Sequence, residues 1–157
     1  MQIPSLAEIK RELSYLNEKE LREYIVDLSK FSRDNKAYLF FKLYGRDQPG
    51  LYVQMVQEDL ELEFQNARGN HSYYAKKSAQ KIRRKMNKLL KLSKEKTDQI
   101  EVLIFFCERM KEYGFLKHGN LVIDNLYKTQ VAKIQKLIAG LHEDLQFDYE
   151  GRVEELE

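Results

Sequence analysis

Cysteine, proline, glycine and tryptophan are all scarce in this sequence. Its 157 residues include one cysteine, two prolines, seven glycines and no tryptophan. A lone cysteine cannot form an internal disulfide, which excludes a small disulfide scaffold. So few glycines exclude a collagen-like chain. Because few residues interrupt a helix, we expect long helices joined by short connections.

Long apolar runs and targeting signals are also lacking. The longest stretch without an ionised side chain, 48–57, is shorter than the roughly 18 apolar residues that a membrane span needs. No apolar segment of the signal-peptide type follows the N-terminus, and Gln2 does not fit a myristoylation signal. We therefore expect a cytoplasmic protein with no membrane span.

Apolar side chains are frequent enough for a folded core. Leu, Ile, Val and Phe make up about 29% of the chain, above the roughly 20% below which disorder is expected. They recur at helical spacing, and no segment alternates like a β-hairpin. Helices are expected at 5–13, 17–31, 37–44, 49–69, 72–92, 97–114 and 121–142.

These segments predict an all-α fold, a compact multi-helix bundle of about seven helices with short connections. Residues 1–157 are expected to form a single all-helical domain, with the acidic C-terminal tail 144–157 continuing as a frayed helix. Val102–Cys107 is the most apolar stretch and predicts the central helix. The helix at 37–44 is apolar on more than one side, which predicts that it is largely buried.

Charge is distributed unevenly behind a formal net charge of +2. Residues 76–96 contain ten basic side chains and one acidic one, whereas residues 143–157 contain seven acidic side chains and one basic one. The small net charge is thus a cancellation between segments. Blocks of opposite sign indicate either internal pairing or a charged partner.

The basic segment predicts an amphipathic helix with a broad cationic face. At about 100° per residue, one arc is apolar: Ala75, Ala79, Ile82, Met86, Leu89 and Leu90. The remaining arc is cationic: Lys76, Lys77, Lys81, Arg83, Arg84, Lys85, Lys88 and Lys91. Like charges four residues apart repel each other by tenths of a kcal/mol, so we expect something to offset the repulsion.

Three explanations fit this face. It is solvated or neutralised internally by the acidic segments 58–63 or 143–157. It binds nucleic acid, with Tyr73 and Tyr74 stacking on bases. Or it binds an acidic protein or an anionic membrane surface. In the second and third cases, the predicted contacts are Tyr73, Tyr74, Lys76, Lys77, Arg83, Arg84, Lys88 and Lys91.

Catalytic and metal-binding patterns are missing from the sequence. His71, His118 and His142 lack a second ligand at metal-binding spacing. No glycine pair is followed by the Lys and Ser or Thr of a phosphate loop. Cys107 lies in an apolar run, which predicts a small buried hydrophobe and not a nucleophile. We expect no enzyme activity and no cofactor or metal site.

Two further groups have alternative explanations. The acidic side chains Glu58, Asp59, Glu61 and Glu63 flank an apolar stripe and are expected to be solvated. The aromatic rings of Tyr38, Phe41 and Tyr44 exceed what one helix face can hide. Two neighbouring helices could bury them, or they could line a groove for a partner helix or a second copy of the chain.

Three stretches carry a resemblance to other proteins. They are Lys10-Arg11-Glu12-Leu13 with Glu20-Leu21, Asn35 to Phe41, and Ile82-Arg83-Arg84 with Phe106-Cys107-Glu108. Together they resemble an uncharacterised group of small all-helical bacterial proteins, seen especially in Bacteroidetes-like lineages. The resemblance implies an all-α fold and a cytoplasmic setting, and it implies no activity and no site residues.

The sequence as a whole predicts a non-enzymatic helical interaction domain that uses the cationic helix at 76–96. Its partner would be an unidentified protein or a second copy of the chain. The alternative is a nucleic-acid-binding protein that uses the same basic surface. A third class is an enzyme whose site is assembled from scattered residues.

Overall fold

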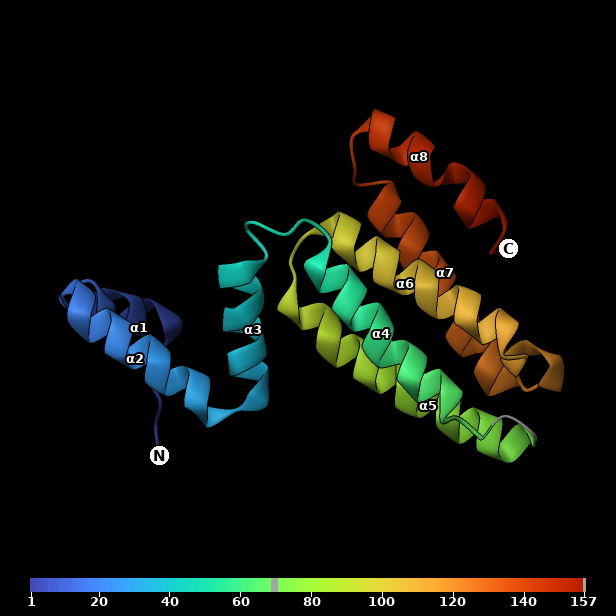
Figure 1. Cartoon of the computed structure of the whole chain (residues 1–157), viewed down its shortest axis with the longest axis horizontal. Coiled ribbons are helices and arrows are strands. Elements are labelled where there is room, and N and C mark those ends of the chain that lie inside the picture. The colour runs from blue at the N-terminus through green and yellow to red at the C-terminus, as the bar shows by residue number, and fades with distance from the viewer. Residues whose placement is uncertain (69–70, 157) are drawn as a thin grey trace.

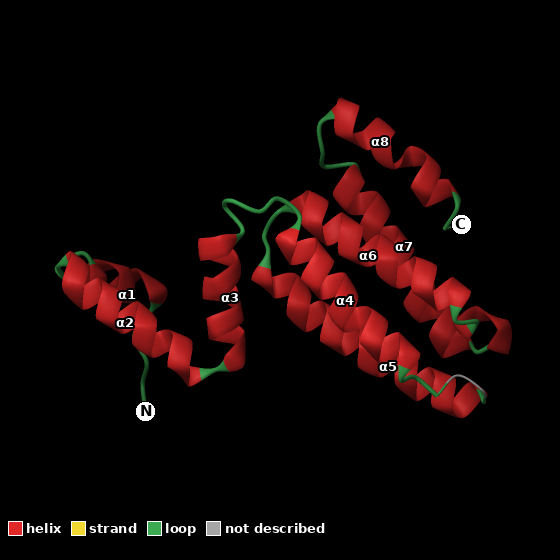
Figure 2. Cartoon of the chain, viewed as in Figure 1, coloured by secondary structure: helices red, strands yellow, loops and turns green. Residues whose placement is uncertain are grey.

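The chain folds entirely into helices and short connections in the part that the structure describes. The structure is a computed structural model, and it describes residues 1–68 and 71–156. Within these residues no strand occurs (Figure 2). The helices are α1 (Leu6–Leu13), α2 (Glu18–Phe31), α3 (Arg33–Tyr44), α4 (Leu51–Gln65), α5 (Ser72–Leu89), α6 (Lys96–Glu112), α7 (Leu121–Ile138) and α8 (Glu143–Glu154), with the 3-10 turns η1 (Leu90–Leu92) and η2 (Phe115–His118).

The predicted all-α multi-helix bundle is confirmed, with eight α-helices in the described residues. The expected helix at 121–142 is wrong in its extent, because α7 ends at Ile138. The His142 side chain then accepts the backbone N–H of Asp144 and caps α8. The expected end of the fourth helix at Gly69 lies outside the described residues, and α4 ends at Gln65. That the chain forms a single domain stays a prediction.

Four helices, α4 to α7, form the body of the fold. Helix α6 packs between α4 and α7, and α5 packs against the same two helices on the other side (Figure 1). As expected, α6 is the most deeply buried helix. Its buried side chains are Ile100, Val102, Leu103, Ile104, Phe106, Cys107 and Met110. The Phe64 ring of α4 lies 5.7 Å from that of Phe106 and joins the two helices.

Helix α8 covers one side of this body. It packs on α7 and buries Tyr149, and Leu156 behind it is also buried. The Tyr127 hydroxyl of α7 donates to the Leu156 carbonyl at 2.7 Å. Arg152 binds both oxygens of Glu101 at 2.9 Å. The acidic C-terminal segment is therefore attached to α6 and α7.

Helices α1 to α3 extend away from the body as an N-terminal arm (Figure 1). None of the three contains a buried residue, so the prediction that 37–44 is largely buried is wrong. The reason is that α3 has the body on one side only. There the Phe41 ring packs edge-on against Tyr52, with centroids 5.3 Å apart, and Asp34 pairs with Lys88 at 3.0 Å.

The helix starts of the arm follow from local sequence. Ser5 and Glu8 form a reciprocal capping box at α1, and Asn17 and Glu20 form another at α2. Each pair satisfies two backbone N–H groups that have no partner inside the helix. Local capping signals therefore account for the helix starts of the arm, although other parts of the protein cover little of its apolar side chains.

Truncating the centre of α6 should destabilise the whole fold. Leu103 is fully buried, so Leu103→Ala removes packed methyl groups and leaves a cavity, which costs about 2–5 kcal/mol of unfolding free energy. Leu121→Ala, at a side chain that is 76% exposed, is the control and should change it by less than about 0.5 kcal/mol. Denaturant unfolding measures both. Equal effects of the two variants would contradict the position of the core.

Candidate interaction surface on helix α5

Helix α5 presents a buried apolar face to the body of the fold. The expected stripe is confirmed: Ala75, Ala79, Ile82 and Met86 are all at most 1% exposed. The opposite arc of the helix carries the basic side chains, as an amphipathic helix requires. Two groups of these basic side chains differ in whether they form ion pairs with other helices.

The first group lies on the flank that faces α4. Lys81 pairs with Glu63 at 2.8 Å, and Lys85 pairs with Glu63 at 3.3 Å and with Asp59 at 3.4 Å. Lys85 Nζ also donates to the Asp59 carbonyl at 3.2 Å. These acids were expected to be solvated, but Asp59 and Glu63 are only partly exposed because α5 lies beside them. Lys88 also forms an ion pair, with Asp34 of α3. We call Lys81, Lys85 and Lys88 the paired flank.

The second group lies on the edge that faces away from α4. Lys77, Arg84 and Lys91 are exposed, and in the described part of the chain no ion pair involves them. We call these three residues the free edge. They are seven positions apart, so Lys77 and Arg84 lie on one line along α5, and Lys91 continues it in η1.

Two predicted contact residues are partly covered. Lys76 and Arg83 lie between the free edge and the buried face, and both are half-buried. The Nε of Arg83 is buried without a hydrogen-bond partner. An arginine in this position covers apolar surface with its stem and carries its charge outwards. The structure therefore places Lys76 and Arg83 beside the free edge, with less of each side chain accessible.

Tyr73 and Tyr74 lie at the start of α5, and each is 48% exposed. Their rings meet edge-on with centroids 5.4 Å apart. Lys77 Nζ lies 4.5 Å from the Tyr73 ring centroid, and Lys76 Nζ lies 5.8 Å from it. Hydrogen bonding to Lys77 and the charges of Lys77 and Lys76 lower the pKa of the Tyr73 phenol. The two tyrosines thus adjoin the free edge.

The described part of the acidic C-terminal segment, residues 143–156, forms no ion pair with α5. Among residues 1–68 and 71–156, no ion pair joins α8 to α5, and Arg152 holds α8 against Glu101. Of the two acidic segments proposed from sequence, only 58–63 contacts the basic helix, through Asp59 and Glu63. The free edge therefore keeps its charge in the folded chain.

The single cysteine lies inside the core. Cys107 is fully buried, and burial together with Glu108 raises the pKa of its thiol to about 12, so the expectation of a small buried hydrophobe is confirmed. In the part of the chain that the structure describes, no three His, Cys, Asp or Glu side chains cluster in a way that could hold a metal ion.

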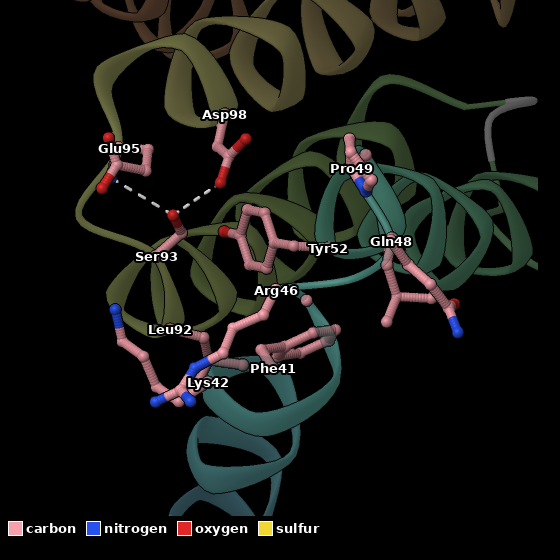
Figure 3. Close-up of a pocket in the computed structure, with 13 residues that line it drawn as sticks. Phe41, Lys42, Arg46, Gln48, Pro49, Tyr52, Leu92, Ser93, Glu95 and Asp98 are labelled. Atoms are coloured by element: carbon pink, nitrogen blue, oxygen red, sulfur yellow. Dashed lines mark hydrogen bonds between the residues drawn. The ribbon is translucent and has the colours of Figure 1, made fainter.

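A pocket of about 530 Å³ with mixed polar and apolar lining lies between the end of α3, the loop before α4 and the start of α6. Lys42 extends from α3 and Arg46 from the loop that follows it, while Glu95 and Asp98 lie across from them and Tyr52 lies between (Figure 3). The sequence did not predict this pocket, because its residues come from separate segments and share no regular spacing.

Three polar side chains of this pocket, those of Ser93, Asp98 and Tyr52, are hydrogen-bonded within the protein. Ser93 donates to Asp98 at 2.6 Å, and Tyr52 donates to the Leu89 carbonyl at 3.0 Å. Burial, followed by the charge of Asp98, raises the pKa of the Tyr52 phenol, so it stays protonated at neutral pH. None of the three histidines lines the pocket. These contacts join α4 to the end of α5, and α6 to the residue that follows η1.

A scan against models of known protein families, a search of curated proteins and a search of solved structures each gave no match. The resemblance to a group of small all-helical bacterial proteins therefore stays a prediction. Among the described residues, no helix is long and apolar enough to cross a membrane.

Removing the carboxylate of Glu63 should destabilise the fold in a pH-dependent way. Its lysine partners lower its pKa below the ordinary 4.5, chiefly through the hydrogen bond from Lys81. A lowered folded pKa stabilises the fold above the unfolded pKa, and this contribution is lost as pH falls through the folded value. We expect Glu63→Gln to cost about 1 kcal/mol at pH 7 and progressively less below pH 4.5.

Denaturant unfolding across this pH range measures the effect. Glu58→Gln is the matched control, because Glu58 is exposed on the same helix and forms no ion pair in the described structure. It should change the unfolding free energy by less than about 0.5 kcal/mol at every pH. A Glu63→Gln effect that does not shrink with acid would argue against the pairing with Lys81 and Lys85.

Proposed function

We propose that this protein is a non-enzymatic helical interaction domain that binds an acidic partner protein through the free edge of α5. One observation carries the proposal. The cations of the paired flank are matched by Glu63, Asp59 and Asp34, whereas Lys77, Arg84 and Lys91 have no ion-pair partner within the described chain. A partner can therefore bind the free edge without breaking an ion pair of the fold.

The spacing of the free edge suits an extended or helical acidic segment. Residues seven apart on a helix are separated by about 10.5 Å along its axis. Each exposed ion pair adds at most about 1 kcal/mol, so a stable complex needs several of them together. Lys76 and Arg83 beside the edge increase the number of cations that one partner can reach. The proposal keeps a cytoplasmic location, which fits a chain with one cysteine, fully buried.

A second candidate function is binding of single-stranded nucleic acid by the same surface. The specific observation in its favour is that Tyr73 and Tyr74 are half-exposed next to Lys76 and Lys77. Exposed aromatic rings beside cations are typical of surfaces on which bases stack. Lys77 lies over the Tyr73 ring, and both rings are 48% exposed.

A triple charge reversal on the free edge should weaken binding to an acidic probe. We expect the full chain to bind fluorescent poly-glutamate at about 50 mM salt and to weaken markedly at about 200 mM, as contacts between opposite charges do. Lys77→Glu/Arg84→Glu/Lys91→Glu should reduce the affinity at least about tenfold. Lys117→Glu/Lys128→Glu/Lys136→Glu, at exposed sites elsewhere, makes the same change in net charge and should retain more of the binding.

The same titration with single-stranded RNA and with duplex DNA separates the two candidates. Tighter binding of RNA than of poly-glutamate, weakened by Tyr74→Ala, would favour the nucleic-acid function over the acidic protein partner. Equal losses from the two triple variants would show that only the total charge matters. That result, or no binding of any probe at low salt, would overturn the proposal for the free edge.

A further inference from the structure

The N-terminal arm exposes an unusual amount of apolar surface. Of the 23 exposed large hydrophobic side chains in the described chain, 14 lie in residues 1–44. Most are on α1 and α2, in which no residue is buried. Helices as short as these are marginal in water unless an apolar face is covered. The arm as it stands therefore lacks part of the packing that such helices need.

The exposed apolar side chains of α1 and α2 lie on one face of each helix, and we call these two faces together the seam. On α2, residues 21, 24, 25, 28 and 31 share one face at helical spacing, and on α1 residues 6, 9 and 13 do the same. The two faces meet at Tyr24, which lines a groove of about 490 Å³ together with Ile9 and Leu13. Two helices alone leave this seam open on one side.

The exposed area of the seam is close to the area that each partner buries in a stable protein–protein interface. Its most exposed members are Leu6, Tyr24, Leu28 and Phe31, at 69%, 52%, 57% and 83%. With Ile9, Leu13 and Ile25, the seam leaves on the order of 800 Å² of side-chain surface in water, which is about what each partner buries in a standard stable complex. One partner of equal size would cover it.

The charges of the arm favour an identical partner. Residues 6–31 contain six acidic and five basic side chains, so two copies can approach without a field of one sign between them. The outer faces are already paired, as Arg22 with Glu18 and Lys30 with Asp27 show. A helix that binds an anionic membrane carries mainly Lys and Arg on its polar face, and this arm does not.

We infer that a second copy of this chain covers the seam, so that two α1–α2 hairpins form a four-helix bundle across a two-fold axis. Two-fold pairing of identical apolar patches is the commonest form of self-association, and residues three and four apart provide the packing that four-helix bundles use. The dimer carries two free edges, and a divalent acidic partner would bind it more tightly than one chain. The seam and the free edge are separate surfaces.

Adjacent substitutions on α2 test this dimer. By light scattering after size-exclusion chromatography, the full chain should have a mass of twice 18.8 kDa at about 50 μM, well above the dissociation constant of a standard interface. Ile25→Glu should shift it to a single chain. Val26→Glu is the matched control, because Val26 is almost equally exposed, 46% against 48%, but lies about 100° away from the seam; it should stay dimeric.

Phe31→Ala separates loss of the dimer from loss of folding. The Phe31 ring is 83% exposed in one chain, so its removal costs that chain little, yet it should weaken dimerisation at least about fivefold. Circular dichroism should show unchanged helix content. The Lys77→Glu/Arg84→Glu/Lys91→Glu variant should remain dimeric, which keeps this inference separate from the proposed function.

The opposite outcomes are equally clear. A full chain that stays at 18.8 kDa at about 50 μM overturns the inference, and binding of that single chain to lipid vesicles would assign the seam to a membrane surface. A dimer that survives both Ile25→Glu and Phe31→Ala would show that another surface forms it.

Discussion

The burial of α6 is the constraint on which the rest of the structure depends. This helix is apolar on almost every side, and Val102, Leu103, Ile104, Phe106 and Cys107 are all fully buried. A helix of this kind must be enclosed by others. Helices α4 and α7 enclose it directly, and α5 closes the bundle from the opposite side. Because α4 packs on α6 with one face and on α5 with a neighbouring flank, Asp59 and Glu63 come to lie beside Lys81 and Lys85.

This arrangement explains how a chain with a small net charge keeps a cationic surface. Surface ion pairs stabilise a fold only slightly. They nevertheless determine which charged side chains are neutralised and which are not. Glu63 and Asp59 neutralise the lysines that α4 can reach, and α3 supplies Asp34 for Lys88. The acids of α8 cannot reach α5, because Arg152 and Tyr127 hold that segment on α6 and α7. In the described chain, Lys77, Arg84 and Lys91 are therefore left without an ion pair on the outer side of α5 and η1.

Much of the fold could be predicted from the sequence, because its signals are local. The capping boxes at Ser5 and Asn17 and the apolar run around Ile104 report on their own segments. Apart from the boundary between α7 and α8, the errors concern how the helices pack on one another. The apolar stripe of α2, with Ile25 and Leu28, has the same spacing as the stripe of α4, with Val56 and Leu60. The α2 stripe is half-exposed and the α4 stripe is buried. Burial depends on which other helices pack on a stripe, and the periodicity of one helix does not reveal those neighbours.

The candidate surface shows the same limit. The helical wheel placed all the basic side chains on one arc, but it could not separate Lys81 from Lys77, because the distinction depends on which flank α4 occupies. The pocket that gathers Lys42, Arg46, Glu95 and Asp98 had no signal at all, since these residues meet only through the packing of α3, η1 and α6. Contacts between charged side chains of different helices are therefore the features of this protein that only the folded structure shows.

Residue-resolved NMR of the full chain during titration with poly-glutamate tests the central claim most directly. The account predicts that the largest shift changes fall at Lys77, Arg84 and Lys91, with Lys76 and Arg83 beside them, while Lys81 and Lys85 change little because Glu63 already binds them. Changes centred on Lys81 and Lys85, or spread evenly over lysines on other helices, would contradict it.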